Sequence, residues 1–139
     1  MKRLLLGCIV AVLLVSCFAG ARISASASTV TAVQPRYTGI VSVRPYLTIQ
    51  ALGKAQCTDR VLVKSGYSAM VTWELQSNAN GTWGTLATWR NSGSGTLSLD
   101  TYRYVTKGAE YRLKTSFKAY DAADILVDDT YFCSSSVSY

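Results

Sequence analysis

The amino-acid sequence predicts an all-β protein, folded as an antiparallel β-sandwich behind an N-terminal signal peptide. From Tyr37 onward apolar residues alternate with polar ones, a period of two that is typical of half-buried strands. Clusters of Gly, Asn, Ser and Asp separate these stretches roughly every ten residues, and no helical period is found beyond the signal. These observations favour about seven short strands in two packed sheets.

Residues 1–27 are predicted to be the signal peptide. The start is basic, Leu4 to Val15 is uncharged, and Ala25-Ser26-Ala27 has the small-x-small pattern that precedes a signal peptidase cut. Ala19-Gly20-Ala21 has the same pattern, so we expect cleavage after Ala27 or after Ala21. The uncharged run falls short of the ~20 residues of a permanent transmembrane helix, which disfavours an uncleaved anchor.

Lipidation is the alternative processing route. Leu14-Val15-Ser16-Cys17 is similar to the lipobox of bacterial lipoproteins, in which the cysteine becomes the diacylated N-terminus. This chemistry needs a thiol directly after a small residue at the end of the apolar core, which Ser16 and Cys17 supply. The protein is therefore expected to be secreted or, if Cys17 is lipidated, to be a cell-surface lipoprotein. Only the signal or this lipid would contact the membrane.

Cleavage after Ala27 leaves a polar lead-in, residues 28–36, and one domain, residues 37–139. The whole chain has a formal net charge of +6, but three basic residues leave with the signal. The remaining 112 residues carry 11 basic and 8 acidic side chains, a net charge of +3, and the basic ones are scattered. This charge is ordinary for a soluble surface and predicts no nucleic-acid partner.

The cysteines predict one cross-link. Cys8 and Cys17 lie in the signal, so Cys57 and Cys133 are the pair of the mature domain. An exported protein with two cysteines most simply joins them, and we expect a Cys57–Cys133 disulfide. It would close a loop of 76 residues, which the chain-entropy model values at roughly 4 kcal/mol. Two free thiols are the alternative, for a cell that leaves exported cysteines reduced.

In the first half of the domain the alternation assigns an inward face to each predicted strand. In the first strand Leu47, Ile49 and Ala51 alternate with polar residues. The stretch from Ala69 to Gln76 is the clearest half-buried strand. Its inward positions are Ala69, Val71, Trp73 and Leu75. On the strand that follows, one parity is shared by Trp83, Thr85, Ala87 and Trp89.

The second half of the domain follows the same rule. Leu97 and Leu99 flank Ser98, and the stretch 111–118 has one apolar face and one cationic, solvent-facing one. The apolar face consists of Tyr111, Leu113, Thr115 and Phe117. The last strand carries Tyr131 and Cys133, then Val137 and Tyr139.

Turns are predicted where residues that tolerate positive φ or cap a bend gather between these strands. The four segments are 78–81, 91–95, 107–108 and 121–124. The first, Asn78-Ala79-Asn80-Gly81, is predicted to be a hairpin loop.

Two details favour an immunoglobulin-like sandwich. Trp73 lies in the third strand, where such sandwiches often place a core tryptophan, and the segment Lys107 to Tyr111 resembles a tyrosine corner. Leu113 stands where an antibody domain has its second cysteine, so the bridge expected here differs from the antibody one.

The domain also resembles a group of small exported proteins of unknown function from Gram-positive, clostridial-type gut bacteria. The resemblance covers roughly residues 37–139 and rests on three short stretches: Ala55-Gln56-Cys57, Leu75-Gln76 with Asn80-Gly81-Thr82-Trp83 and Trp89, and Gly108-Ala109-Glu110-Tyr111-Arg112. It implies an immunoglobulin-like sandwich and no catalytic residue, because the group has no assigned activity. The last hairpin departs from the group, since residues 121–124 lack its glycine.

The residues that catalysis needs are scarce. The sequence has no histidine, which excludes Ser-His-Asp and Cys-His nucleophiles, imidazole bases and nearly all zinc sites. Glu74 and Glu110 are the only glutamates, one on a strand and one in a corner. A group of aspartates near the C-terminus (Asp121, Asp124, Asp128 and Asp129) is expected to form a turn and a charged edge rather than a calcium site. No enzyme activity, metal or cofactor is expected.

Aromatic residues carry the one functional prediction. Three Trp and nine Tyr fall in the mature domain, and Trp83 and Trp89 lie on the strand after the first hairpin. Such side chains can stack against sugar rings or anchor a protein interface, although they can also close the sandwich. We therefore expect a non-catalytic binding or surface-interaction module with a protein or glycan partner. The alternative is a carbohydrate-binding module that uses Trp83 and Trp89.

Overall fold

The computed structural model describes residues 36–139. The predicted signal peptide, Cys17 and the lead-in up to residue 35 lie outside the described residues. The described residues belong to one compact unit. None of its helical segments has the length and hydropathy to cross a bilayer, among the residues described.

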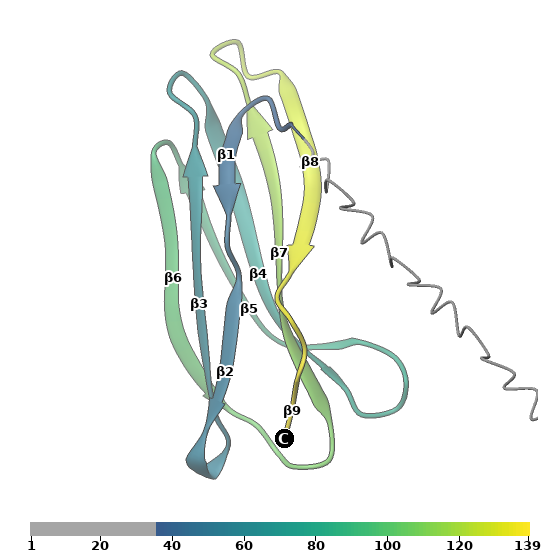
Figure 1. Cartoon of the computed structure of the whole chain (residues 1–139). Helices are drawn as coiled ribbons and strands as arrows, with labels where there is room; N and C mark the ends of the chain where they lie inside the picture. Colours follow the sequence, from purple (N-terminus) through teal and green to yellow (C-terminus); the bar gives the residue numbers. More distant parts are fainter. Residues whose placement is uncertain (1–35) are drawn as a thin grey trace, which may run out of the picture. The chain divides into compact units, whose positions relative to one another are not determined.

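Two antiparallel sheets make up the described domain (Figure 1). The four-stranded sheet contains β1 (Ile40–Val43), β2 (Tyr46–Gln50), β3 (Lys54–Val63) and β6 (Thr96–Tyr104). The five-stranded sheet contains β4 (Ser68–Asn78), β5 (Gly84–Gly93), β7 (Glu110–Tyr120), β8 (Leu126–Cys133) and β9 (Val137–Ser138). A 3₁₀ turn, Ala51–Gly53, joins β2 to β3.

The strand order is that of an immunoglobulin-like sandwich. β1 and β2 pair one after the other with the same edge of β3, and β8 and β9 do the same with β7. The sequence predicted about seven strands and the structure has nine, because two of the positions are each formed by two short strands. β6 pairs with the other side of β3, and the second sheet has the order β5-β4-β7-β8. Constant-type immunoglobulin domains place the fourth strand in the first sheet, whereas β5 here pairs with β4 in the second.

The core lies between the sheets, at the inward positions that the period of two predicted. On β4 and β7 the buried residues include Ala69, Val71, Trp73 and Leu75, and Tyr111, Leu113, Thr115 and Phe117. Each large apolar side chain buried in this way contributes about 1.5–3 kcal/mol relative to full exposure. Packing of this face, rather than backbone propensity, therefore fixes the register of the central strands.

The predicted tyrosine corner is confirmed at the start of β7. The Tyr111 hydroxyl donates a hydrogen bond to the backbone carbonyl of Thr106 at 2.6 Å, and its ring is buried. Gly108 lies between them with φ of 95°, a left-handed conformation that favours glycine. The bond ties the connection from β6 to the strand that follows it.

A β-bulge overturns the predicted parity of the strand after the hairpin. Leu75 pairs with Ala87 but Gln76 pairs with Thr85, so Leu86 is an extra residue. Ala87 and Trp89 consequently face the core, whereas Thr85 bonds to Glu74 on the outer face. Trp83 lies before β5 and on the outer side, against Arg112. Trp83 and Trp89 thus do not share a face.

The predicted Cys57–Cys133 disulfide is absent from the structure, in which both thiols are free. Cys57 is fully buried on the inward face of β3. Cys133 pairs with Lys114, whose side chain lies on the outer face of the five-stranded sheet, while its neighbour Phe132 packs inward. The five-stranded sheet therefore separates the two sulfur atoms, which is a consequence of strand parity that cysteine counting cannot reveal.

Candidate functional site

A buried carboxylate joins the two sheets. Asp59 on β3 is only 5% exposed, and its Oδ2 accepts hydrogen bonds from Trp73 Nε1 at 2.8 Å and Thr115 Oγ1 at 2.6 Å. Its Oδ1 accepts from the backbone N–H groups of Arg44 and Arg60 at 3.0 and 2.6 Å. Four donors use the acceptor capacity of the group, so Asp59 is a structural residue.

The burial of Asp59 was not predicted from the sequence, although the residue pattern of β3 indicates it. Ala55, Cys57, Val61 and Val63 are the other inward residues of β3, and Asp59 is the one acid on this parity. An acid flanked by apolar residues on a buried face requires donors from the opposite sheet. Which donors these are depends on the packing of β4 and β7 against β3.

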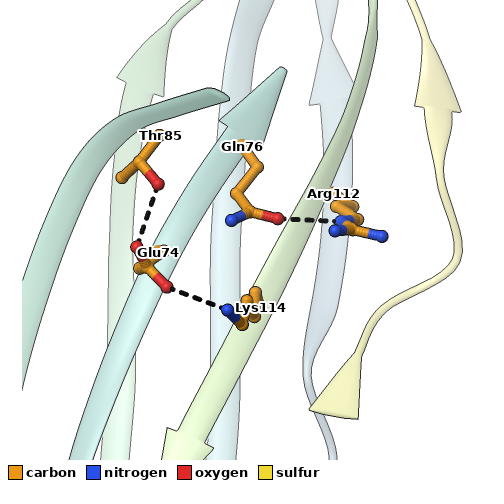
Figure 2. Close-up of polar contacts among 5 residues, drawn as sticks. All are labelled: Glu74, Gln76, Thr85, Arg112 and Lys114. Atoms are coloured by element: carbon orange, nitrogen blue, oxygen red, sulfur yellow. Dashed lines mark hydrogen bonds and ion pairs between the residues drawn. The ribbon is translucent and has the colours of Figure 1, made fainter. Parts of the chain in front are cut away.

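The outer face of the five-stranded sheet carries an ordered polar cluster (Figure 2). Glu74 on β4 accepts a hydrogen bond from Thr85 Oγ1 at 2.9 Å and lies 3.6 Å from Lys114 Nζ. Gln76 Oε1 accepts a hydrogen bond from Arg112 Nε at 2.9 Å. These contacts link β5, β4 and β7 across the sheet and hold both cations of β7 in place.

Aromatic rings support the same two cations. The guanidinium carbon of Arg112 lies 4.1 Å from the centre of the Trp83 ring, and Lys114 Nζ lies 4.8 Å from that of Tyr131. Cation–π contacts of this kind contribute about 0.5–1 kcal/mol at exposed sites. Two cation–aromatic pairs therefore lie next to each other on one sheet face.

Arg112 differs from Lys114 in its charge balance. Lys114 pairs with Glu74, and Lys118 pairs with Asp129 at 3.7 Å. Within residues 36–139 no carboxylate forms an ion pair with Arg112, whose Nε is bound by a neutral amide. The stacked guanidinium is thus pre-oriented, and its terminal amino groups can bind a carboxylate or phosphate in bidentate fashion. We call Trp83, Gln76, Arg112, Lys114 and Tyr131 the outer-face cluster.

The two tryptophans predicted as a stacking pair are not brought together. Trp89 lies opposite Trp73 and packs partly buried against the core. Trp83 is half-buried beneath Arg112. A flat surface built from both indole rings is therefore not present in this structure.

Three aspartates of the C-terminal group make side-chain contacts, including the ion pair of Asp129 with Lys118. Asp121 accepts hydrogen bonds from the backbone of Ala123 and Ile125 and closes the last hairpin. Asp128 binds the backbone N–H groups of Thr38 and Gly39 at 3.0 and 2.7 Å. No cluster of three or more potential metal-ligating residues is found in the described part of the chain.

Tyr37, the first aromatic residue of the domain, packs beside β8. The Tyr37 ring packs edge-on against Phe117 and Phe132, at 5.4 and 5.6 Å between ring centres. Burial, and then the charge of Asp128, raise the pKa of the Tyr37 hydroxyl above its ordinary value of 10.0. Residues 37–39 are thereby held against β8 just before β1 begins.

The outer face of the four-stranded sheet exposes tyrosines instead of tryptophans. Tyr46, Tyr102 and Tyr104 are 62%, 51% and 69% exposed. The rings of Tyr102 and Tyr104 meet edge to face at 5.8 Å, and Lys54 Nζ lies 4.4 Å from the centre of the Tyr102 ring. The exposure of these rings depends on strand register. Alternation along the sequence alone does not tell whether a tyrosine lies on the outer face or in the core.

Neither a family model nor a curated protein matches the chain. The geometry of these surfaces is therefore what a functional proposal must rest on.

Proposed function

We propose that the protein is exported and acts as a non-catalytic binding module, which contacts an anionic partner surface through the outer-face cluster. The observation that carries the proposal is the Arg112 guanidinium, oriented by Trp83 and Gln76 and without an ion pair in residues 36–139. A cation held in place before binding loses less side-chain entropy when a carboxylate or phosphate binds to it.

Binding to immobilised poly-glutamate, a simple anionic probe, tests this proposal. The exported wild-type protein is expected to bind it and not to bind poly-lysine, with an affinity that falls as salt rises. Arg112→Glu should weaken binding by about tenfold or more, because it replaces the pre-oriented cation with a like charge. Arg60→Glu is the matched control, since Arg60 is exposed on the other sheet. Equal losses in both variants would contradict a specific role of the cluster.

Export through residues 1–27 is part of the proposal. The mature N-terminus and its mass, measured on the exported protein, separate a free Ser28 from a free Arg22 and from a diacylated Cys17. A free Ser28 is expected for a secreted protein. An N-terminus at Met1 would contradict cleavage altogether.

A second candidate function is carbohydrate binding, with tyrosines in place of the tryptophans. It is favoured by the three exposed rings of Tyr46, Tyr102 and Tyr104 on the four-stranded sheet, because such rings can stack on sugars. Affinity electrophoresis in neutral polysaccharide gels tests it. Tyr102→Ala should abolish retardation, whereas Tyr131→Ala, on the other sheet, should not. Identical mobility in gels with and without polysaccharide would exclude this function for the polymers used.

A further inference from the structure

Residues 105–109 connect β6 to β7 at one end of the sandwich (Figure 1). These residues line a groove. It has a volume of about 400 Å³ and is lined by residues of β4, β5, β6, β7 and this connection. The volume lies in the range of about 300–1,000 Å³ that small-molecule sites occupy. The groove is separate from the outer-face cluster, because Leu75 and Tyr111, which line it, face the inside of the sandwich.

The apolar part of the groove includes one exposed leucine. Leu75 and Val105 are buried, whereas Leu86 is 51% exposed. Leu86 is the extra residue of the β-bulge, and the bulge directs its side chain to this groove. Bulges commonly re-aim a side chain toward a binding site, and an exposed leucine beside buried ones offers apolar surface to a ligand.

The charged part of the groove is entirely positive. Arg103 and Lys107 line it, and no acidic residue does. Arg103 pairs with the fully buried Ala55 of β3, but its own side chain is exposed, as is that of Lys107. No ion pair involves Arg103 within residues 36–139. Two exposed cations beside apolar surface, with no carboxylate in the lining, favour an anionic ligand.

We propose that this groove binds the free anion of a single-chain fatty acid, with its carboxylate at Arg103 and its hydrocarbon chain against Leu86 and the edge of Val105. The proposal concerns a different site from the outer-face cluster and goes beyond the binding function assigned to it. A carboxylate satisfies the guanidinium, and the chain covers the exposed leucine. For a single-chain fatty acid such as octanoate in this half-open groove, we expect a Kd on the order of 0.1–1 mM.

Calorimetric titration of the exported protein with octanoate, octan-1-ol and octylamine tests the charge preference. Octanoate is expected to bind at least about tenfold more tightly than octylamine, since the ammonium is repelled by Arg103 and Lys107. Octan-1-ol should bind more weakly than octanoate. Equal affinities for octanoate and octylamine, or no binding heat with octanoate at millimolar concentration, would overturn the proposal.

Two variants locate the site. Arg103→Gln should weaken octanoate binding by about tenfold and leave octan-1-ol binding unchanged. Leu86→Asn should weaken the binding of both ligands, because it removes apolar contact rather than charge. Arg90→Gln, an exposed arginine on β5 that does not line the groove, is the matched control. Each variant is used once its urea midpoint matches that of the wild type. Octanoate affinity unchanged in Arg103→Gln, or reduced equally in Arg90→Gln, would assign the binding to another surface.

Discussion

At the scale of single residues, Asp59 is the most informative side chain. It carries charge into the interior and holds Trp73 and Thr115 of the five-stranded sheet from β3 of the other sheet. Polar groups satisfied in this way make a core specific, because any other packing leaves them unpaired. Asp59 is thus a structural contact between the sheets in a protein whose predicted disulfide is absent.

Replacement of Asp59 measures this contribution. Asp59→Ala is expected to lower the free energy of unfolding by about 2–4 kcal/mol, because the buried donors of Trp73 and Thr115 lose their acceptor. Urea unfolding followed by tryptophan fluorescence gives the value. Asp100→Ala is the control, since Asp100 is exposed on the same sheet and should change stability by less than about 0.5 kcal/mol. A loss at Asp59 no larger than at Asp100 would show that the contact is dispensable.

The two cysteines are expected to differ in reactivity. Burial raises the pKa of the Cys57 thiol from 9.0 to about 11, whereas Cys133 is only half-buried on the outer face. Thiolate is the reactive form, so iodoacetamide at pH 8 should alkylate Cys133 and leave Cys57 unmodified in the folded protein. Peptide mass spectrometry identifies the labelled residue. Labelling of both sites only after reduction and denaturation would instead indicate a disulfide.

The raised pKa of Cys57 also predicts a pH dependence of stability. The folded state binds the thiol proton more tightly than the unfolded state, whose pKa is near 9.0. This contribution is complete below pH 9 and is lost as pH rises from 9 through about 11. Wild-type stability should therefore fall more steeply across this interval than that of Cys57→Ala, in urea titrations at matched pH. Parallel slopes for the two proteins would contradict the link.

At the scale of elements, the tyrosine corner and the bulge show two ways in which a strand is placed. The corner fixes the start of β7 through one hydrogen bond from Tyr111, and a short sequence motif predicts it. The bulge on β5 places Thr85 and Ala87 on opposite faces, and no residue in this strand predicts the bulge. A bulge depends on the partner strand, so an alternation count along one strand cannot detect it.

Tyr111→Phe tests the corner. The variant keeps the buried ring and removes only the hydroxyl that donates to Thr106, so a loss of about 1 kcal/mol in the free energy of unfolding is expected. Comparison of the urea unfolding curves of the variant and the wild type resolves such a change. Tyr46→Phe, which alters an exposed tyrosine on β2, should leave stability unchanged and serves as the control. A free energy of unfolding that is as unchanged in Tyr111→Phe as in Tyr46→Phe would mean that water replaces the corner hydrogen bond at no cost.

At the scale of the whole molecule, stability comes from the packed sandwich and not from a cross-link. Both thiols are free and lie on different sides of the five-stranded sheet. The two sheets pack through the inward faces of β3, β4, β6 and β7, and Asp128 holds the backbone of Thr38 and Gly39 just before β1. The domain is therefore expected to unfold as one cooperative unit.

Reductant should consequently leave this unfolding unchanged. The urea midpoint of the exported protein is expected to be the same with and without dithiothreitol, because no bond between Cys57 and Cys133 is present to be reduced. A native disulfide closing the loop would instead contribute about 4 kcal/mol and lower the midpoint on reduction. Intact mass before and after reduction, with alkylation, is the accompanying control. A midpoint that falls in reductant would restore the disulfide that the cysteine count predicted.

The sequence by itself determined the fold class and the buried faces of β4 and β7, because a period of two along a strand states which side meets the core. It placed three of the four predicted turns, whereas residues 91–93, predicted as part of a loop, belong to β5. It also located the tyrosine corner and the core tryptophan. Only the tertiary structure decided which side chains meet between strands: that Asp59 reaches Trp73 and Thr115, and that Cys57 and Cys133 do not meet. It likewise showed that Trp83 stacks on Arg112 and not beside Trp89. These contacts depend on register, a bulge and the packing of two sheets, which are relations between distant segments that local alternation does not encode.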